Sequence, residues 1–263
     1  MVSALGLPVA VRVTGDRAAE VTERLAVLWE LCEPDPDAVA VTTVEAVFDS
    51  DPSVCGAAAD SGLLTRHRLD DLLQVLTQRI TLAAIDGRAG DALMLHAACL
   101  ADPATGRAAA FVAPGGTGKT TLVRTLGPGR WYVTDETTVV LDDRTVVPYP
   151  KPLSLRRTPE SLYKDETPPT ELGLTGATGQ VRLAALCLLD RDDTHAGPPR
   201  VTPLGTLDAL VALVPQTSHL PEMGRPLQRL AALCESLGGV HRVTYRESAE
   251  LADVVDGWIG GAG

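Results

Sequence analysis

The chain contains no asparagine and only three lysines, Lys119, Lys151 and Lys164, against twenty arginines. Without asparagine there is neither the N-K-x-D guanine-reading motif of GTPases nor the metal-binding asparagine of ordinary protein kinases. The apolar runs are far shorter than a membrane span, and the N-terminus lacks the basic and apolar regions of a signal peptide. These absences predict a cytoplasmic protein with no membrane partner.

Positive charge is also scarce. The formal net charge is −11 over 263 residues, and no dense run of lysine and arginine occurs. Such a chain is poorly suited to bind nucleic acid or anionic membranes. The cysteines are widely scattered without a C-x-x-C pair, which favours buried reduced thiols over disulfides or a zinc site. They are Cys32, Cys55, Cys99, Cys187 and Cys234.

The most informative stretch is Ala113-Pro-Gly-Gly-Thr-Gly-Lys-Thr-Thr121, which lies between an apolar run at 108–112 and a helical pattern. It matches G-x-x-x-x-G-K-[ST] except that Ala113 replaces the first glycine, and it predicts a phosphate-binding loop. Lys119 would reach the β and γ phosphates, and the Thr120 hydroxyl would ligate Mg²⁺. The alternative is a plain glycine-rich turn. The expected nucleotide-binding residues are Pro114, Gly115, Gly116, Thr117, Gly118, Lys119, Thr120 and Thr121.

Residues 1–90 carry no nucleotide or metal motif and predict a small α/β module. Its periodicity indicates strands at 8–14 and 38–48. The same patterns indicate helices at 16–31 and 69–85 and a loop at 49–62.

Residues 91–263 predict a second domain built around the loop. Strands at 92–101 and 108–112 flank a turn and should form a hairpin, which would set His96 opposite Val112 or Ala113. A helix from Lys119 leads to a strand at 131–134, and Asp135 follows that strand. Because the carboxyl ends of parallel strands share one edge of a sheet, Asp135 should face the nucleotide.

The remainder of this domain alternates strands and helices. A hairpin is expected at 137–141 and 145–149, then an extended proline-rich segment at 148–155 and a substrate or lid loop at 164–180. A strand at 180–190, helices at 207–214 and 227–237, a strand at 241–245 and a helix at 249–259 complete the expected order.

His96, the loop, the Val133-Thr-Asp-Glu136 stretch and the later Pro-Tyr-Pro-Lys-Pro-Leu-Ser-Leu-Arg segment resemble the catalytic half of HPr kinase/phosphorylase. The likeness covers roughly residues 92–260 and is greatest to the HPr-kinase-related proteins of peptide-modifying gene clusters, including lasso peptide clusters. It implies an α/β fold with a P-loop HPr-kinase-like, or phosphoenolpyruvate-carboxykinase-like, mixed sheet core beside the small N-terminal module. The parent family's long glycine-rich signature is not evident, so phosphorylase activity, the hexamer and HPr as substrate are not implied.

Carried over by position, the resemblance matches Asp135 to the base on a serine hydroxyl and His96 to the histidine that precedes the loop, while Glu136 stands where the family has a second aspartate. His96 would hold Asp135 or the γ-phosphate in place. It implies an ATP- and Mg²⁺-dependent kinase that phosphorylates a small protein or peptide, with a homo-oligomer left open. Thr120, Asp135 and Glu136 are the expected metal ligands. Lys151, Arg156 and Arg182 are candidates for binding the substrate.

Each role has a plainer alternative. Asp135 could hold Mg²⁺ through water, His96 could be a core residue, and Glu136 could face solvent. The basic candidates could be surface charges or structural ion pairs. For the whole chain, a non-catalytic ATP-binding regulatory or docking protein and a small-molecule kinase remain open.

Overall fold

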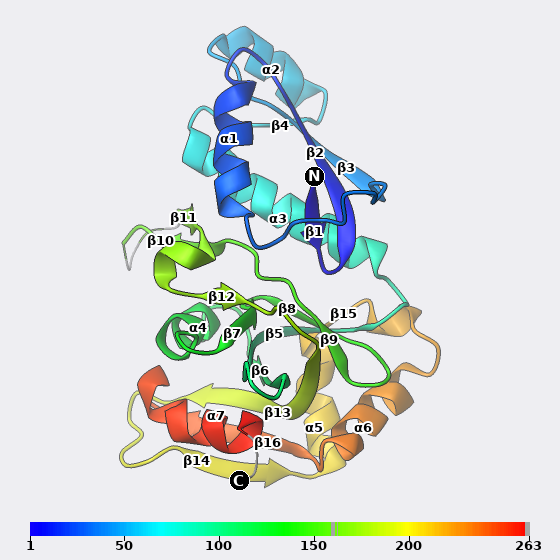
Figure 1. Ribbon diagram of the computed structural model, residues 1–263, viewed down its shortest axis with the longest axis vertical. Coiled ribbons are helices and arrows are strands. Elements are labelled where there is room, and N and C mark those ends of the chain that lie inside the picture. The colour runs from blue at the N-terminus through cyan, green and yellow to red at the C-terminus, as the bar shows by residue number, and fades with distance from the viewer. Residues whose placement is uncertain (159–160, 162, 261–263) are drawn as a thin grey trace. The chain divides into compact units, whose positions relative to one another are not determined.

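The computed structural model describes residues 1–158, 161 and 163–260, in which helices and mixed sheets give the expected α/β class (Figure 1). By their internal contacts the residues form two compact units. One comprises Met1–Gly87 with Lys151–Leu172, and the other comprises Arg88–Pro150 with Gly173–Gly263. We call them the N-terminal unit and the larger unit.

The N-terminal unit is a four-stranded sheet, within the described residues, with the order β1-β2-β3-β4. β1 is antiparallel to β2, whereas β2, β3 and β4 are parallel and joined by helices. Helix α1 buries Val21, Leu25 and Leu28, whose spacing puts them on one face. The elements are β1 (Val2–Ala4), β2 (Leu7–Thr14), α1 (Ala18–Leu28), β3 (Thr42–Val47), α2 (Pro52–Asp60), β4 (Leu64–Thr65) and α3 (Leu69–Gly87).

Helix α2 lies where the sequence predicted a loop at 49–62, so that prediction is wrong. Asp51 caps the helix by accepting a hydrogen bond from the Ser53 amide at 2.8 Å, and Pro52 occupies the first helical turn. These start signals outweigh the weak helical periodicity of a segment rich in alanine and glycine.

The segment 151–172 differs from the expected division at residue 90, because it packs with the N-terminal unit. β10 (Leu153–Arg156) and β11 (Lys164–Thr167) form an antiparallel pair, and the 3₁₀ helix η1 (Pro169–Leu172) follows. The stretch 164–180, predicted as a loop, therefore contains regular structure, including β12 (Thr175–Gly176) in the larger unit.

The larger unit is organised around β5 (Leu93–Ala101), which is buried along its length except for the half-buried His96. It pairs with β6 (Arg107–Val112) on one side and with β7 (Trp131–Thr134) and β8 (Thr137–Val140) on the other. The remaining strands are β9 (Thr145–Val147), β13 (Val181–Arg191), β14 (Arg200–Leu204), β15 (Thr217–Ser218) and β16 (Val240–Tyr245). The helices are α4 (Lys119–Leu126), α5 (Thr206–Leu213), η2 (Val214–Gln216), η3 (Leu220–Glu222), α6 (Pro226–Ser236), η4 (Ser248–Leu251) and α7 (Ala252–Ile259).

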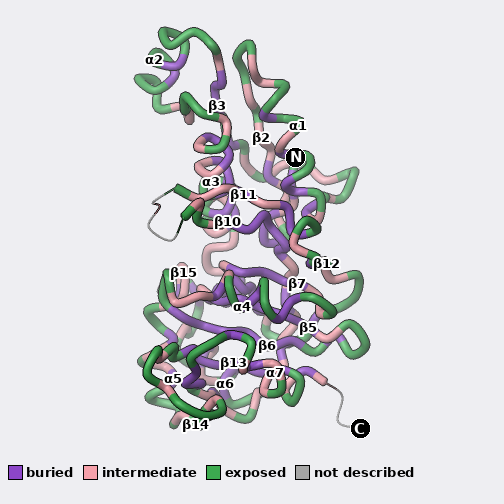
Figure 2. The backbone as a smooth tube through the Cα atoms, turned by 90° about the vertical axis from the view of Figure 1, so that its left-hand side faces the viewer, coloured by how far each residue is buried: buried purple, intermediate pink, exposed green. Residues whose placement is uncertain are grey.

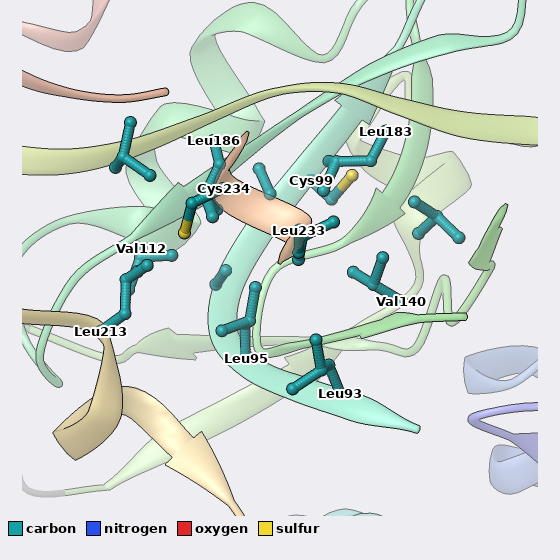
Figure 3. Packing of buried hydrophobic residues seen from close by; sticks show 14 of the residues in the cluster. Leu93, Leu95, Cys99, Val112, Val140, Leu183, Leu186, Leu213, Leu233 and Cys234 are labelled. Atoms are coloured by element: carbon teal, nitrogen blue, oxygen red, sulfur yellow. The ribbon is translucent and has the colours of Figure 1, made fainter. Parts of the chain in front are cut away.

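Part of this sheet closes on itself. β5 pairs with β6, β6 with β13, β13 with β9, β9 with β8, and β8 returns to β5. Alternate β5 residues, such as Leu93, Leu95 and Cys99, point into a hydrophobic cluster that Leu213 of α5 and Leu233 of α6 also enter (Figure 3). Successive side chains of a strand point to opposite faces, and His96 alternates with these residues, so its side chain leaves β5 on the other face.

Burial follows this organisation: β5, β6, β7, β8 and β13 are largely buried, whereas β14 and many turn and helix residues are exposed (Figure 2). All five cysteines are buried and free, as predicted. Burial raises the pKa of the Cys32 thiol to about 12 and that of Cys234 to about 11. Among the described residues, helices with the length and apolarity needed to span a bilayer are absent.

Candidate phosphate-binding site

The glycine-rich loop joins the end of β6 to the start of α4. Gly116 and Gly118 have φ values of 82° and 102°, which glycine adopts at little cost. A Cβ added at either position would meet no atom within 4 Å in the described part of the chain, so their hydrogens face open space. The Leu122 amide donates to the Gly118 carbonyl at 2.8 Å and starts the helix. The loop thus presents backbone amides at a helix N-terminus, as anion binding requires.

Lys119 is only 7% exposed, and its ammonium folds back onto the loop. Nζ donates to the Ala113 carbonyl at 2.6 Å and to the Pro114 carbonyl at 3.2 Å. Burial lowers the pKa of Lys119 to about 8, although the nearby carboxylates of Asp135 and Glu136 oppose that shift. The lysine is a concentrated positive charge held at the mouth of the loop.

The strands bring two acidic residues to the same place. β6 and β7 are both antiparallel to β5 and hence parallel to each other, and Val112 and Thr134, at their ends, pair with Ala97 and Cys99. Asp135 and Glu136 separate β7 from β8 at this edge, where the Ala97 amide donates to the Glu136 carbonyl at 3.0 Å. The expected hairpin forms, and it pairs Ala97 with Val112, so His96 is not opposite Val112, the first of the two positions expected for it.

Asp135 is 5% exposed and accepts hydrogen bonds at both carboxylate oxygens. The Thr120 hydroxyl donates to Oδ2 at 2.8 Å, and the Tyr132 hydroxyl donates to Oδ1 at 3.1 Å. Tyr132 is fully buried, so it fixes the carboxylate from the protein side. Sequence reasoning missed Tyr132, because a single buried tyrosine forms no recognisable pattern in the sequence.

His96 is half-buried and lies within electrostatic reach of the charged groups at the loop. Burial and then the charge of Lys119 lower the pKa of His96, while Glu136 and Asp135 oppose the shift. The lowered pKa keeps the imidazole neutral at pH 7, so it can both donate and accept a hydrogen bond. His96 is therefore influenced by the charges of Lys119, Glu136 and Asp135, and its role at the loop stays a prediction.

The donor set at the loop suits a hard cation. Thr120, Asp135 and Glu136 offer hydroxyl and carboxylate oxygens, the ligands that Mg²⁺ prefers, and phosphates supply more in nucleotide sites. Glu136 is half-buried, and its amide donates to the Thr134 hydroxyl at 3.2 Å. In the described part of the chain, groups of three or more His, Cys, Asp and Glu side chains placed to hold a metal are absent.

Of the three basic residues expected to bind substrate, two lie in the other unit and only Arg182 lies in the same unit as the loop. Lys151 and Arg156 belong to the N-terminal unit, where the Lys151 Nζ is buried against the Pro152 carbonyl and Arg156 donates to the Ser161 carbonyl at 2.6 Å. Arg182 pairs with Arg107 at the start of β6, whereas the loop follows its end. Five residues of strand, about 17 Å, separate these positions. Arg182 was a candidate because of its charge, which does not show where a residue lies in the fold.

Comparison with known proteins adds no relative from which roles could be transferred: no protein-family model and no curated protein sequence matches the chain. The likeness to HPr kinase/phosphorylase therefore rests on sequence patterns: the order of His96, the loop and the acidic pair, and the segment 148–156.

Proposed function

We propose that the protein is an ATP- and Mg²⁺-dependent kinase that transfers the γ-phosphate to a serine hydroxyl of a small protein or peptide. The observation that carries this proposal is the Asp135 carboxylate, which is hydrogen-bonded to Thr120 and Tyr132 beside the buried Lys119. The finer fold assignment, an HPr-kinase-like P-loop core in a cytoplasmic protein, is part of the same proposal.

The binding roles follow from the loop. Backbone amides of residues 115–120 would surround the β and γ phosphates, and the Lys119 ammonium would exchange its two carbonyl partners for phosphate oxygens. Thr120, Asp135 and Glu136 would hold Mg²⁺, which neutralises charge on the transferring group when bound.

The transfer step requires a base beside the γ-phosphate. As the serine oxygen forms its bond to phosphorus, the bond to the ADP oxygen breaks and the hydroxyl proton passes to Asp135. Tyr132 would keep that carboxylate oriented, because it is buried and donates at 3.1 Å. His96, neutral at pH 7, would orient the acceptor or the acidic pair by hydrogen bonding.

The same geometry supports a second candidate. In P-loop ATPases an acidic residue after a neighbouring strand holds the metal together with the loop hydroxyl, and the Thr120 to Asp135 hydrogen bond fits that role too. A nucleotide-binding regulatory or docking protein would use the site in this way, without an acceptor.

The deciding experiment is incubation with ATP labelled at the γ-phosphate, Mg²⁺ and a panel of serine-containing peptides. We expect label on serine with the wild type and with Asp253→Asn, an exposed acidic control on α7. Asp135→Asn should lower transfer by about 10²- to 10⁴-fold while ATP still binds. ATP binding with no labelled peptide, or unchanged transfer by Asp135→Asn, would contradict the kinase and favour the second candidate.

A further inference from the structure

A second site lies in the larger unit, in a cavity of about 630 Å³. That volume is typical of pockets that bind small organic molecules. Leu93, Leu141 and Leu233 supply apolar lining. Residues 113–121, His96 and Asp135 do not line it, so the cavity is separate from the proposed nucleotide site.

Arginine dominates the charge of this cavity. Arg144, Arg182, Arg225 and Arg229 line it, against two acidic residues, Asp142 and Asp143, which leaves a formal charge of +2. The chain as a whole carries −11. A concentration of positive charge in an acidic protein marks a place where anions collect.

Two of the arginines are anchored. The Arg144 guanidinium donates to the Ser236 carbonyl, at the end of α6, at 2.9 Å. Arg229 donates to Asp142 through Nε at 3.1 Å and through Nη2 at 2.6 Å. Fixed guanidinium groups lose little conformational entropy when they bind a ligand.

The other two have their donors available. Within the described residues, neither Arg182 nor Arg225 makes a side-chain hydrogen bond or an ion pair. Asp143 attracts Arg182 but hydrogen-bonds the Thr145 amide and hydroxyl, and the bonds hold the pKa of Asp143 below its usual value. Asp143 is therefore ionised and already engaged, which leaves both guanidinium forks for a ligand.

Backbone conformation adds an independent indication. Arg144 and Arg225 have φ values of 71° and 55°, and they are two of four non-glycine residues with positive φ in the described part of the chain. Such conformations are unfavourable for residues with a Cβ and concentrate at functional sites. Arg225 also precedes Pro226 at the N-terminus of α6, where the helix dipole adds positive potential.

We propose that this cavity binds a small organic anion with two or more carboxylate or phosphate groups. Arg182 and Arg225 contact the charged groups, Arg144 and Arg229 add fixed donors, and the leucines cover the carbon skeleton. Carboxylate and phosphate groups each offer a pair of oxygens that a guanidinium can bind bidentately, so the two are distinguished by experiment.

The test is calorimetric titration of citrate and of pyrophosphate into the Lys119→Ala protein. That background weakens phosphate binding at the loop, so the result does not depend on the kinase proposal. We expect one bound anion per chain and an affinity about tenfold or more lower in Arg182→Gln/Arg225→Gln. Arg200→Gln/Arg242→Gln removes the same charge from exposed positions on β14 and β16 and should bind normally.

A second variant tests the cavity by its shape. Ala232 lines it, is exposed on α6 and can be replaced by tryptophan without a change in charge. Ala232→Trp should reduce anion binding while its melting temperature stays near that of the parent. Tighter binding of citrate would show that the site prefers carboxylate groups, and tighter binding of pyrophosphate would show that it prefers phosphate groups. Equal losses in the two double variants, full binding by Ala232→Trp, or no binding of either anion at millimolar concentration would overturn the proposal.

Discussion

The glycine-rich loop and the arginine-lined cavity are both suited to anions, yet they are built from different parts of the chain. The loop uses backbone amides, two glycines with positive φ and one lysine that is 7% exposed. The cavity uses guanidinium groups from the β8–β9 turn, the start of β13 and helix α6, most of them near solvent. A site formed by backbone amides requires consecutive residues. A site formed by long side chains can use residues that are distant in the sequence and close together in the fold.

The difference predicts how each site responds to loss of charge. Lys119→Ala removes the one ammonium at the loop, so ATP affinity and phosphoryl transfer should fall together, transfer by about 10³-fold or more. Calorimetry with ATP and the labelled-phosphate assay measure the two effects. Lys164→Ala, a lysine of β11 in the N-terminal unit, is the matched control and should leave both unchanged. If transfer survives in Lys119→Ala, the loop is not the nucleotide site.

A change of pH should separate the sites with the protein unaltered. The pKa of Lys119 is about 8, and bound phosphates would raise it. Binding above pH 8 then takes up a proton, and ATP affinity should fall as pH rises, by up to about tenfold per unit. Arginine stays protonated throughout, so citrate binding at the cavity should not change between pH 7.5 and 9.5, to within about twofold.

Replacement of the lysine by arginine controls that experiment. Lys119→Arg keeps its charge above pH 12, so whatever ATP affinity it retains should be independent of pH over the same range. An equal fall in wild type and Lys119→Arg would assign the pH dependence to another group.

The sequence located most of the loop site because its determinants are local. Strand patterns at 92–101 and 108–112 predicted the hairpin, and its short turn fixed the register that pairs Ala97 with Val112. Asp135 was predicted at the loop because β7 runs parallel to β6, and its hydrogen bond to Thr120 brings the two together. Tyr132 was missed because a buried tyrosine has no sequence pattern of its own.

The cavity and the packing of 151–172 could not be predicted, since both depend on contacts between distant segments. Arg144 and Arg229 are far apart in the chain, and only the closed circuit of strands brings β9 and β13 to the face that α6 covers. Arg182 was expected near the substrate on grounds of charge, but the parallel register with β6 sets it at the strand end away from the loop. The positive charge of an arginine is evident from the sequence, but its position in the fold is not.

The smallest expected effect concerns the backbone of the cavity. Arg225 has a φ of 55°, a conformation that costs a residue with a Cβ about 1 kcal/mol. Arg225→Gly removes that strain, and after the entropy that glycine adds to the unfolded chain it should raise the free energy of unfolding by about 0.5 kcal/mol while weakening citrate binding. Arg200→Gly, in the extended strand β14, should instead lower the free energy of unfolding. Urea denaturation of both variants measures these signs. If Arg225→Gly and Arg200→Gly destabilise the protein equally, then Arg225 is unstrained, and an arginine at this position does not lower the stability of the fold.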